Sequence, residues 1–510
     1  MGYKIVTLQM PTNFNAEALE KKLSRMLGIR NFSWQVESKS LDARKKQNIF
    51  WLLKVVVHSP ELKGEALPEK ERLEIPYRKR NSNVVVVGSG PAGFFAAFVL
   101  QKAGFNVILI ERGSDVKTRG TSIRNFEKTG AFDCKNNYAF GEGGAGTFSD
   151  GKLTSRSKHI SKEKQFITEC YIAAGAPEEI AYMAHPHLGT NNLRKIVKNL
   201  RDNFQAIGGK FLFDTMFERF SVKKQSVTEV ITSNGNFRVD ALFVAPGHSA
   251  HETYLMLMEH GVTFRTKNFA IGSRMEHRQE VINRAQWGKP QLPGVKAAEY
   301  RLTSPADGIH QVFSFCMCPG GMVVPAAAYA DTNIVNGMSH YQRNGAFANA
   351  ACVAGIHPDE LTGKTVSPQD ALKYLGDLEK MFYAIAGGYG APFCNIQDFI
   401  QQKEKTSSCE SSYPLGLLPL PLWRLLPKTV VHSMQHGLTD FIRKMKGFET
   451  GILLGLESKT SSPVQVVRER NGLCAGFDNL YLIGEGSGFA GGIMSSAADG
   501  IKAAMSLAGS

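Results

Sequence analysis

The 510-residue sequence has few cysteines and no long hydrophobic run. Its eight cysteines include no CxxC pair, so we expect neither a disulfide scaffold nor a zinc site of the usual spacing, and no metal. A membrane-spanning helix needs about 18 consecutive apolar residues, which the sequence does not contain. The first residues have no long apolar core of the kind found in signal peptides, and no lipidation pattern is present. These absences favour a cytoplasmic protein in a reducing compartment.

The composition is that of a folded protein with an excess of positive charge. Hydrophobic residues make up 43% and charged residues 21%, which excludes wholesale disorder. The net charge is +14, and residues 1–80 hold 16 Lys and Arg against 9 Asp and Glu, or half of the excess. Such basicity suits nucleic acid or an acidic substrate, or a solvated basic face. No nucleic-acid-binding motif is present, so we favour the solvated face.

The first 80 residues predict a small α+β module followed by a linker. Residues 3–8 are typical of a strand, and Asn15 and Gly28 bracket a helix with apolar residues at helical spacing. Residues 32–36 alternate and residues 49–57 are apolar, so two further strands are expected, with residues 40–47 as the loop between them. The order β-α-β-β is half of a ferredoxin-like unit. Residues 59–80 are charged and contain three prolines, as linkers do.

A dinucleotide-binding motif follows the linker. Residues 83–87 form a short apolar run, typical of a strand buried on both faces of a parallel sheet. This run leads into the glycine motif of residues 88–93, a helix over 94–103 and a second buried strand over 107–110 that ends at Glu111. Glycines at these spacings let the backbone turn tightly and approach a pyrophosphate at a helix N-terminus, while the acid accepts hydrogen bonds from a ribose.

A second strand–glycine–helix element lies near the other end of the sequence. Residues 478–483 predict a buried strand, and the glycine-rich residues 484–492 precede a helix over 494–504. Between the two motifs, residues 241–245 predict a further buried strand that ends in Pro-Gly. A cofactor held from both motifs must be long, and a flavin dinucleotide is long enough. We therefore expect FAD.

These glycine motifs resemble the glutathione-reductase-type FAD-binding fold. The chain is more similar still to a family of uncharacterised bacterial-type FAD-dependent dehydrogenases that carry a small N-terminal module. The blocks that carry the likeness are residues 40–46, 88–93, 111–113, 140–153, 244–250, 314–321, 457–463 and 484–488. The resemblance covers essentially the whole chain, and its implied activity is that of an oxidoreductase without a settled substrate.

The resemblance implies a cofactor site built from the glycine motifs and the loop at 141–149. Glu485 stands where this type of family often has Asp, and it would bind the pyrophosphate or ribityl region. The N-terminus of the last helix would stabilise negative charge on the flavin. The implied cofactor-binding residues are Gly88, Ser89, Gly90, Pro91, Ala92, Gly93, Glu111, Arg112, Gly141, Gly143, Gly144, Gly146, Thr147, Gly247, Gly484, Glu485, Gly491, Gly492 and Ile493.

The expected fold class is α/β: a Rossmann-like FAD-binding domain with an inserted α+β substrate domain and a ferredoxin-like N-terminal module. The expected boundaries are 1–75 for the module, 81–262 and 451–510 for the two parts of the FAD domain, and 263–450 for the inserted domain. No second strand–GxGxxG–helix unit is present, which argues against a dedicated NAD(P)H domain.

Residues that contact a substrate are harder to identify. Lys152 and Arg156 suit an acidic substrate or a solvated surface equally well. Cys316 and Cys318 share one face of a regular strand, where a redox role and packing beside the flavin are both open. Glu457 and Lys459 follow a buried strand, either as site residues or as an internal ion pair. Arg343, after His340 and Tyr341, is a weaker candidate of the same kind, and His248 is interpreted as a turn residue.

The function predicted from the sequence is an FAD-dependent oxidoreductase that transfers hydride between flavin and a small-molecule substrate. Its electron acceptor or donor is open and includes NAD(P)H bound transiently. Two alternatives stay open: a flavoprotein that modifies tRNA through its basic module, and a non-catalytic flavin-binding protein.

Overall fold

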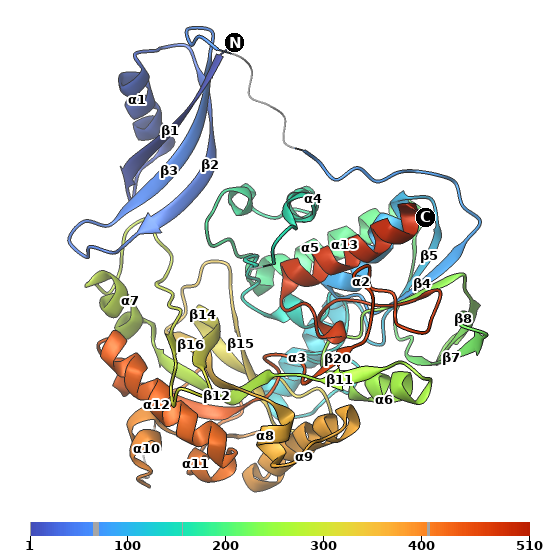
Figure 1. Ribbon diagram of the computed structural model, residues 1–510. Helices are drawn as coiled ribbons and strands as arrows, with labels where there is room; N and C mark the ends of the chain where they lie inside the picture. Colours follow the sequence, from blue (N-terminus) through green and yellow to red (C-terminus); the bar gives the residue numbers. More distant parts are fainter. Residues whose placement is uncertain (1, 65–70, 156, 405–408, 510) are drawn as a thin grey trace.

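The computed structural model describes residues 2–64, 71–155, 157–404 and 409–509. Arg156 and part of the predicted linker, residues 65–70, therefore lie outside the described residues. Figure 1 shows a small N-terminal module beside a larger body in which the two strand–glycine–helix segments come together. Within the described residues, no helix combines the length and the apolar character needed to cross a membrane.

The N-terminal module is a three-stranded sheet with one helix. Strands β1 (Gly2–Pro11) and β2 (Ser33–Asp42) pair antiparallel with the central strand β3 (Phe50–Ser59), and α1 (Ala16–Leu27) connects β1 to β2. The β-α-β-β order confirms the predicted half of a ferredoxin-like unit. β2 is longer than predicted because its pairing with β3 continues to Asp42, so the expected loop at 40–47 begins later.

The module is attached to the body by backbone pairing. The Lys39 N–H donates to the Tyr182 carbonyl oxygen at 2.8 Å, and the Ala184 N–H donates to the Lys39 carbonyl oxygen at 2.9 Å. The segment 182–184 thus extends the exposed edge of β2, and this edge is not left unpaired. The Lys39 ammonium lies 4.6 Å from the centre of the Trp51 ring, where its charge is partly buried.

The body contains a five-stranded parallel sheet in the order β21-β10-β4-β5-β6. Four of its five strands are continuous apolar runs of the sequence. Helices cover one face of the sheet, and residues 217–239 and 254–264 cover the other, so the sheet is buried on both faces. The strands are β4 (Asn83–Val87), β5 (Asn106–Ile110), β6 (Lys210–Leu212), β10 (Ala241–Val244) and β21 (Leu480–Leu482).

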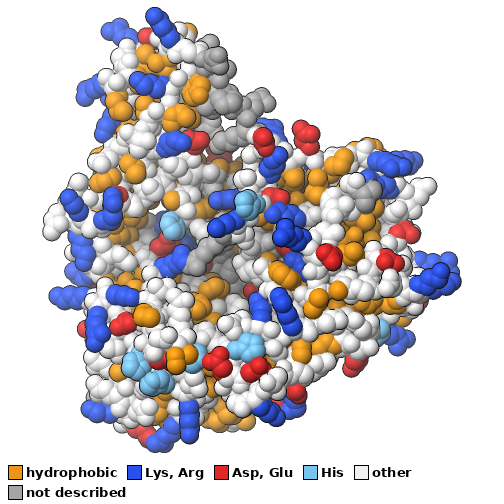
Figure 2. Space-filling model, viewed as in Figure 1, with side chains coloured by type: hydrophobic (Ala, Val, Ile, Leu, Met, Phe, Trp, Pro, Cys, Tyr) orange, Lys and Arg blue, Asp and Glu red, His pale blue; other side chains and the backbone are white. Residues whose placement is uncertain are grey.

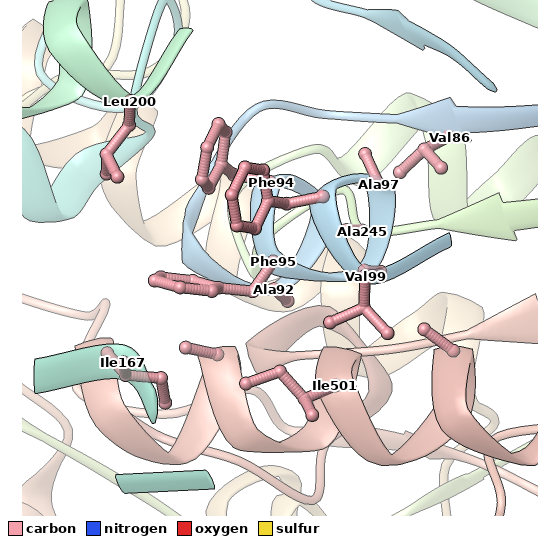
Figure 3. Close-up of a cluster of buried hydrophobic side chains, with 14 of the residues drawn as sticks. Val86, Ala92, Phe94, Phe95, Ala97, Val99, Ile167, Leu200, Ala245 and Ile501 are labelled. Atoms are coloured by element: carbon pink, nitrogen blue, oxygen red, sulfur yellow. The ribbon is translucent and has the colours of Figure 1, made fainter. Parts of the chain in front are cut away.

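The first and last helices of the body pack against each other. α2 (Pro91–Lys102) and α13 (Ile493–Gly509) share a core of small and aromatic side chains, part of which Figure 3 shows between the two helices. Gly500 permits this contact, because a Cβ there would lie 2.1 Å from the Ala92 carbonyl oxygen. Segments about 400 residues apart in the sequence therefore form one rigid unit.

The inserted region forms an eight-stranded sheet in the order β13-β14-β16-β12-β19-β17-β18, with β15 paired to β14. All its pairings are antiparallel except that of β17 with β18. Helices α9 (Pro368–Ala386) and α12 (Lys428–Lys444) contribute to its main apolar core. The strands are β12 (Phe269–Arg278), β13 (Thr303–Ser304), β14 (Val312–Pro325), β15 (Val335–Ser339), β16 (Phe347–Ile356), β17 (Ala391–Asn395), β18 (Leu417–Pro419) and β19 (Ile452–Glu457).

The remaining elements surround these sheets. A three-stranded meander, β7-β8-β9, precedes β10, and β11 pairs antiparallel with β20 where the chain crosses between the two domains. The bounds are β7 (Phe217–Lys223), β8 (Ser226–Thr232), β9 (Gly235–Arg238), β11 (Phe264–Thr266), β20 (Val464–Val466), α3 (Val116–Thr129), α4 (Ser161–Ala173), α5 (Gly189–Ala206), α6 (His251–Glu259), α7 (Gln279–Trp287), α8 (Pro358–Thr362), α10 (Ile396–Gln401) and α11 (Leu422–Leu425).

A buried histidine in β12 makes the stability of the fold depend on pH. His277 Nε2 bonds to the Phe448 carbonyl oxygen at 2.8 Å, so Nε2 carries the proton, while Nδ1 is buried with no hydrogen-bond partner among the described residues. A proton at Nδ1 would be unpaired and buried. Burial accordingly lowers the pKa of His277 to about 4.

We expect the free energy of unfolding to decrease as the pH falls from about 6.5 towards 4. In this range His277 binds a proton in the unfolded chain but stays neutral in the folded chain. For His277 the loss between pH 6.5 and 5 should be about 2 kcal/mol. Urea unfolding at pH 7 and pH 5 gives this loss for the wild type and for His277→Gln. The difference between the two losses is the contribution of His277, since other buried histidines contribute equally to both proteins. Equal losses in the two proteins would contradict the assignment.

Candidate functional site

The turn after β4 has the geometry that the glycine motif predicts. Gly88 has φ 90°, and a Cβ on it would lie 2.3 Å from the Ala245 carbonyl oxygen. A Cβ on Gly93 would lie 1.9 Å from the Gly88 carbonyl oxygen. Gly90, at the N-cap of α2, differs from both, because a Cβ there would have no neighbour nearer than the Gly144 Cα at 3.9 Å. Gly88 and Gly93 serve the fold, whereas Gly90 leaves space in front of the helix.

Glu111 connects this turn to two other segments. Its Oε2 accepts hydrogen bonds from the Ser89 N–H at 3.0 Å and the Ser89 hydroxyl at 2.7 Å. Its Oε1 accepts from the Gly113 and Gly141 N–H groups, each at 3.1 Å. The carboxylate therefore fixes the turn and the 141–149 loop, in addition to lining the cavity described below.

Replacement of Glu111 by alanine should weaken both the fold and the cofactor site. The N–H groups of Ser89, Gly113 and Gly141 would lose a buried acceptor, at about 1–3 kcal/mol for each group left unsatisfied. We expect Glu111→Ala to lower both FAD occupancy and the unfolding free energy of the apoprotein, and Glu111→Gln to lower them less. Unfolding of the apoprotein and FAD content after gel filtration measure the two effects. Unchanged FAD occupancy in Glu111→Ala would exclude a role in cofactor binding.

The 141–149 loop is held by a buried arginine that the sequence analysis missed. Arg119, in α3, is fully buried and donates to five carbonyl oxygens, and burial lowers its pKa to about 10. Nothing in the sequence marks it, because an arginine in a helix is usually solvated. The oxygens belong to Asn137, Tyr138, Gly141, Glu142 and Gly144, at 2.8–3.2 Å.

One cavity of about 1440 Å³ joins the two cofactor-binding segments to the inserted domain. Its walls come from the turn after β4, the end of β5, the 144–152 loop, the segment after β10 and the start of α13. β14 and β15 of the inserted sheet close the other side. Figure 2 shows the face of Figure 1 hollowed near its centre, with Lys, Arg and His side chains around the hollow.

Most predicted cofactor-binding residues line this cavity, and the others lie behind its wall. Those in the lining are Gly88, Ser89, Gly90, Pro91, Ala92, Glu111, Arg112, Gly144, Gly146, Gly247, Gly484, Glu485, Gly491, Gly492 and Ile493. Gly93, Gly141, Gly143 and Thr147 are outside the lining. Gly141 packs against Arg119, since a Cβ on it would lie 2.5 Å from Arg119 Cδ, and Gly143 packs against Thr147 in the same way.

The lining fits a flavin dinucleotide. A Cβ on Gly247, Gly491 or Gly492 would meet no atom within 4 Å, so these glycines leave open space along the cavity wall. The backbone N–H groups at the start of α2 suit a pyrophosphate. The volume exceeds the roughly 300–1,000 Å³ of an ordinary ligand pocket, which leaves room for a second molecule.

His248 and Glu485 form a pair in this wall. His248 Nδ1 lies 3.4 Å from Glu485 Oε1, and His248 Nε2 is buried without a partner among the described groups. An unpartnered ring nitrogen in a cavity wall suits a polar ligand, so the interpretation of His248 as a simple turn residue misses a candidate binding group.

Lys152 and Arg343 meet at a carboxylate that the sequence analysis did not single out. Asp150 is buried, forms an ion pair with Lys152 and accepts two hydrogen bonds from Arg343, at 3.0 Å to Nε and 2.6 Å to Nη2. Despite burial, the charges of Lys152 and Arg343 hold the pKa of Asp150 well below its ordinary value. All three side chains line the cavity, which places a fixed polar cluster where the 144–152 loop meets the inserted domain.

Lys459 is also in the cavity lining, in contact with two other side chains. Its ammonium lies 2.9 Å from Glu379 Oε1 and 3.0 Å from His251 Nε2. Burial, together with the Lys459 charge, holds the pKa of His251 well below its ordinary value, so the imidazole is neutral and accepts from the ammonium.

Glu457 does not line the cavity. It forms an ion pair of 2.9 Å with Arg274, and the two side chains are 1% and 0% exposed. Of the two interpretations given to Glu457 and Lys459, the internal ion pair describes Glu457, whose partner lies in the neighbouring strand β12. No residue near Glu457 in the sequence indicates this partner, which is 183 positions away.

Cys316 and Cys318 do not share a face as they would on a regular strand. The register of β14 shifts between Phe315 and Cys318, and Cys316 has φ 44°. Cys316 consequently lines the cavity, whereas Cys318 is buried and does not.

Comparisons with known proteins identify two segments and one full-length relative. Residues 268–460 match the family described as "FAD-dependent protein, C-terminal domain-like", and residues 86–146 match "NAD(P)-binding Rossmann-like domain". An "Uncharacterized protein" of Clostridium beijerinckii is 36% identical over 99% of this chain and 98% of its own length. A tRNA 5-methylaminomethyl-2-thiouridine biosynthesis bifunctional protein of Campylobacter fetus is 44% identical over 48 residues, or 9% of this chain and 8% of its own.

Solved structures include distant neighbours. Glycine oxidase from Bacillus cereus is 10% identical, with 84% of this chain and 95% of that chain covered at a TM-score of 0.33. L-proline dehydrogenase from P. horikoshii is 12% identical, with 84% and 94% covered at a TM-score of 0.34. These low scores leave the substrate of this chain open.

Proposed function

The chain and its full-length Clostridium relative belong to one family, which the matched C-terminal domain identifies as FAD-dependent oxidoreductases, and we propose that this chain transfers hydride between FAD and a small molecule bound in its central cavity. The observation that carries this proposal is the composition of the cavity wall. The two dinucleotide-binding segments form one side and the inserted sheet forms the other, so cofactor and substrate have separate walls in one space.

The cofactor assignment follows from the groups on the first side. The N–H groups at the start of α2 and the space in front of Gly90 suit the pyrophosphate, and Glu111 lies where the ribose is expected. The start of α13, with Gly491 and Gly492, suits the flavin ring, toward which the helix N-terminus directs positive potential. When bound, FAD supplies two-electron redox chemistry.

The substrate side supports a polar small molecule. Asp150, Lys152 and Arg343 hold each other in place, so a substrate meets fixed charges without reorganisation of the wall. Phe313 and Phe315 of β14 add apolar surface to the same wall. The glutathione-reductase-like placement of the glycine motifs and the transient use of NAD(P)H as electron donor remain part of this proposal.

We also propose limits for the domains and a cellular location. β19 (Ile452–Glu457) pairs with β12 and β17 of the inserted sheet, so we place the end of the inserted domain near residue 460, beyond the predicted residue 450. The other predicted limits are kept. All eight cysteines are free, which suits the reducing cytoplasm.

The purified protein should be yellow and should release FAD when denatured, because we propose that the cavity holds the cofactor by non-covalent contacts. Absorbance of the native protein and chromatography of the released cofactor measure the FAD content per chain. A colourless preparation that takes up no added FAD would contradict the proposed function. A bound flavin that no donor reduces would instead favour the non-catalytic alternative.

A further inference from the structure

Cys316 and Cys318 form a thiol pair at the cavity, for which the proposed function has no role. The Cys318 thiol donates to the Cys316 carbonyl oxygen at 3.3 Å, so the two residues are in direct contact. The irregular backbone of β14 at this point gives Cys316 a positive φ that a non-glycine residue seldom adopts. Bulges and strained residues of this kind occur next to active sites, where they direct a side chain.

Buried and cavity-lining cations surround the pair. Arg274 Nη2 donates to the Cys316 carbonyl oxygen at 2.8 Å and lies 3.7 Å from Cys318 Sγ. The hydrogen bond with Cys318, together with the charges of Arg274 and Lys152, lowers the pKa of Cys316 to about 7 against the opposing effect of burial. A thiol in such surroundings is about half thiolate at neutral pH, far more than an ordinary cysteine, and the thiolate is the nucleophile.

Three other cysteines respond differently to burial. Burial raises the pKa of Cys170, Cys394 and Cys474 to about 12, even though Lys102 lies near Cys170 and Arg468 near Cys474, so these thiols stay protonated at neutral pH. Burial and the hydrogen bond with Cys316 also raise the pKa of Cys318. The pair is therefore asymmetric: Cys316 is reactive and reaches the cavity, while Cys318 is protonated and buried next to it.

We propose that Cys316 and Cys318 are a redox-active dithiol that reduces a small disulfide in the cavity, with Cys316 as the attacking thiol and Cys318 as the resolving thiol. This inference names the class of electron acceptor of the proposed oxidoreductase and rests on that function for its electrons: the small molecule that transfers hydride to FAD is a reductant such as NAD(P)H, and the dithiol passes the two electrons on to the disulfide.

The exchange balances in two steps. The Cys316 thiolate attacks one sulfur of the substrate, forming a mixed disulfide, and the other substrate sulfur leaves as a thiolate that takes the proton lost by Cys316. Cys318 then loses its proton and attacks Cys316 Sγ, forming the Cys316–Cys318 disulfide and releasing the second substrate thiol, which takes that proton. The pair has lost two electrons and two protons to the substrate. Reduced FAD supplies the two electrons and two protons that restore the dithiol.

The pair can be tested by trapping its intermediates in the holoprotein. Wild type, Cys316→Ser, Cys318→Ser and the exposed control Cys134→Ser are treated with oxidised glutathione without oxygen, quenched in acid and alkylated. Trypsin then cleaves after Arg301 and Arg343, and the peptide between them contains both cysteines and no other. Mass spectrometry of this peptide shows disulfides, glutathionyl groups and alkyl groups.

The wild type and Cys134→Ser should yield this peptide with an internal disulfide and no alkyl group. Cys318→Ser should carry one glutathionyl group on Cys316, whereas Cys316→Ser should react at Cys318 at least about tenfold more slowly. Two alkylated thiols in the wild-type peptide, or equal reaction in the two single variants, would overturn the proposal. Photoreduction of the bound flavin should restore two alkylatable thiols in the oxidised wild type, and a disulfide that persists beside reduced flavin would overturn the electron source.

FAD content is measured on the same samples. The serine variants should keep wild-type FAD content and thermal unfolding, which excludes misfolding as the reason for a lost reaction, and alanine variants provide a second check. A wild type without FAD would contradict the proposed function, whereas normal FAD with an unreactive pair would contradict only this inference.

Discussion

Gly90→Leu is expected to abolish FAD binding in a chain that still folds. Gly90 has φ −64° and ψ 176°, which any residue adopts, and an added Cβ has no neighbour nearer than 3.9 Å. The rest of the leucine side chain must occupy the cavity in front of α2, where we place the pyrophosphate. We expect the affinity for FAD to fall by about a hundredfold or more, equivalent to roughly 2.7 kcal/mol.

Titration of the apoprotein with FAD and thermal unfolding of the apoprotein measure this effect. Gly376→Leu is the matched control, because Gly376 lies in α9 with no atom within 4 Å of an added Cβ, and its FAD affinity should not change. Gly93→Leu should differ from both and should not fold, since its Cβ would overlap the Gly88 carbonyl oxygen. Wild-type FAD affinity in Gly90→Leu would refute the assigned pyrophosphate site.

Glu457→Ala is expected to lower the free energy of unfolding by about 3–5 kcal/mol, because it leaves the Arg274 guanidinium charged and buried without its partner. The guanidinium has no alternative carboxylate within ion-pair distance among the described residues. Glu457→Gln should cost less, since the amide oxygen still accepts a hydrogen bond from Arg274. Urea unfolding monitored by circular dichroism gives these differences.

An exposed ion pair serves as the control for Glu457. Lys373 and Asp377 in α9 lie 2.6 Å apart with 73% and 56% of their side chains exposed, so Asp377→Ala should cost no more than about 0.5 kcal/mol. If Glu457→Ala instead lost activity and kept wild-type stability, the result would support the site role that the sequence analysis considered for Glu457.

The sequence predicted the FAD domain well because its signals are local. Four of the five strands of the parallel sheet are short apolar runs that the sequence predicted, whereas β6 (Lys210–Leu212) was not predicted. Gly88 and Gly93 occupy positions where any side chain would collide with backbone or a neighbouring residue. Such constraints act within about thirty residues and are visible as spacing. The convergence of the two ends was also predictable, since both carry the same strand–glycine–helix pattern.

The inserted sheet was less predictable because its strands do not follow a simple hydrophobic pattern. β12 contains three charged or titratable residues close together, Arg274, Glu276 and His277, and all three are buried. From the sequence alone, such a segment looks exposed to solvent. A partner on another strand offsets the cost of burying such a charge, as Glu457 does for Arg274. Pairings over 100 residues or more have no local signature, which is why the contact of Asp150 with Arg343 was missed and Glu457 stayed open between a site residue and an internal ion pair. Arg119 was missed for another reason: its partners are only 18–25 positions away, but an arginine in a helix gives no sign that it is buried.

Because the cofactor site needs both α2 and α13, FAD can bind fully in the cell only after α13 has been synthesised. The dinucleotide turn is synthesised about 400 residues before α13, and at roughly 5–20 residues per second the ribosome needs about 20–80 s for that interval. During this time the nascent chain contains the first dinucleotide-binding segment but not the second. Ala92, against which Gly500 later packs, is then still exposed. Riboflavin starvation should therefore accumulate finished, colourless chains that become yellow when the vitamin returns, without new translation.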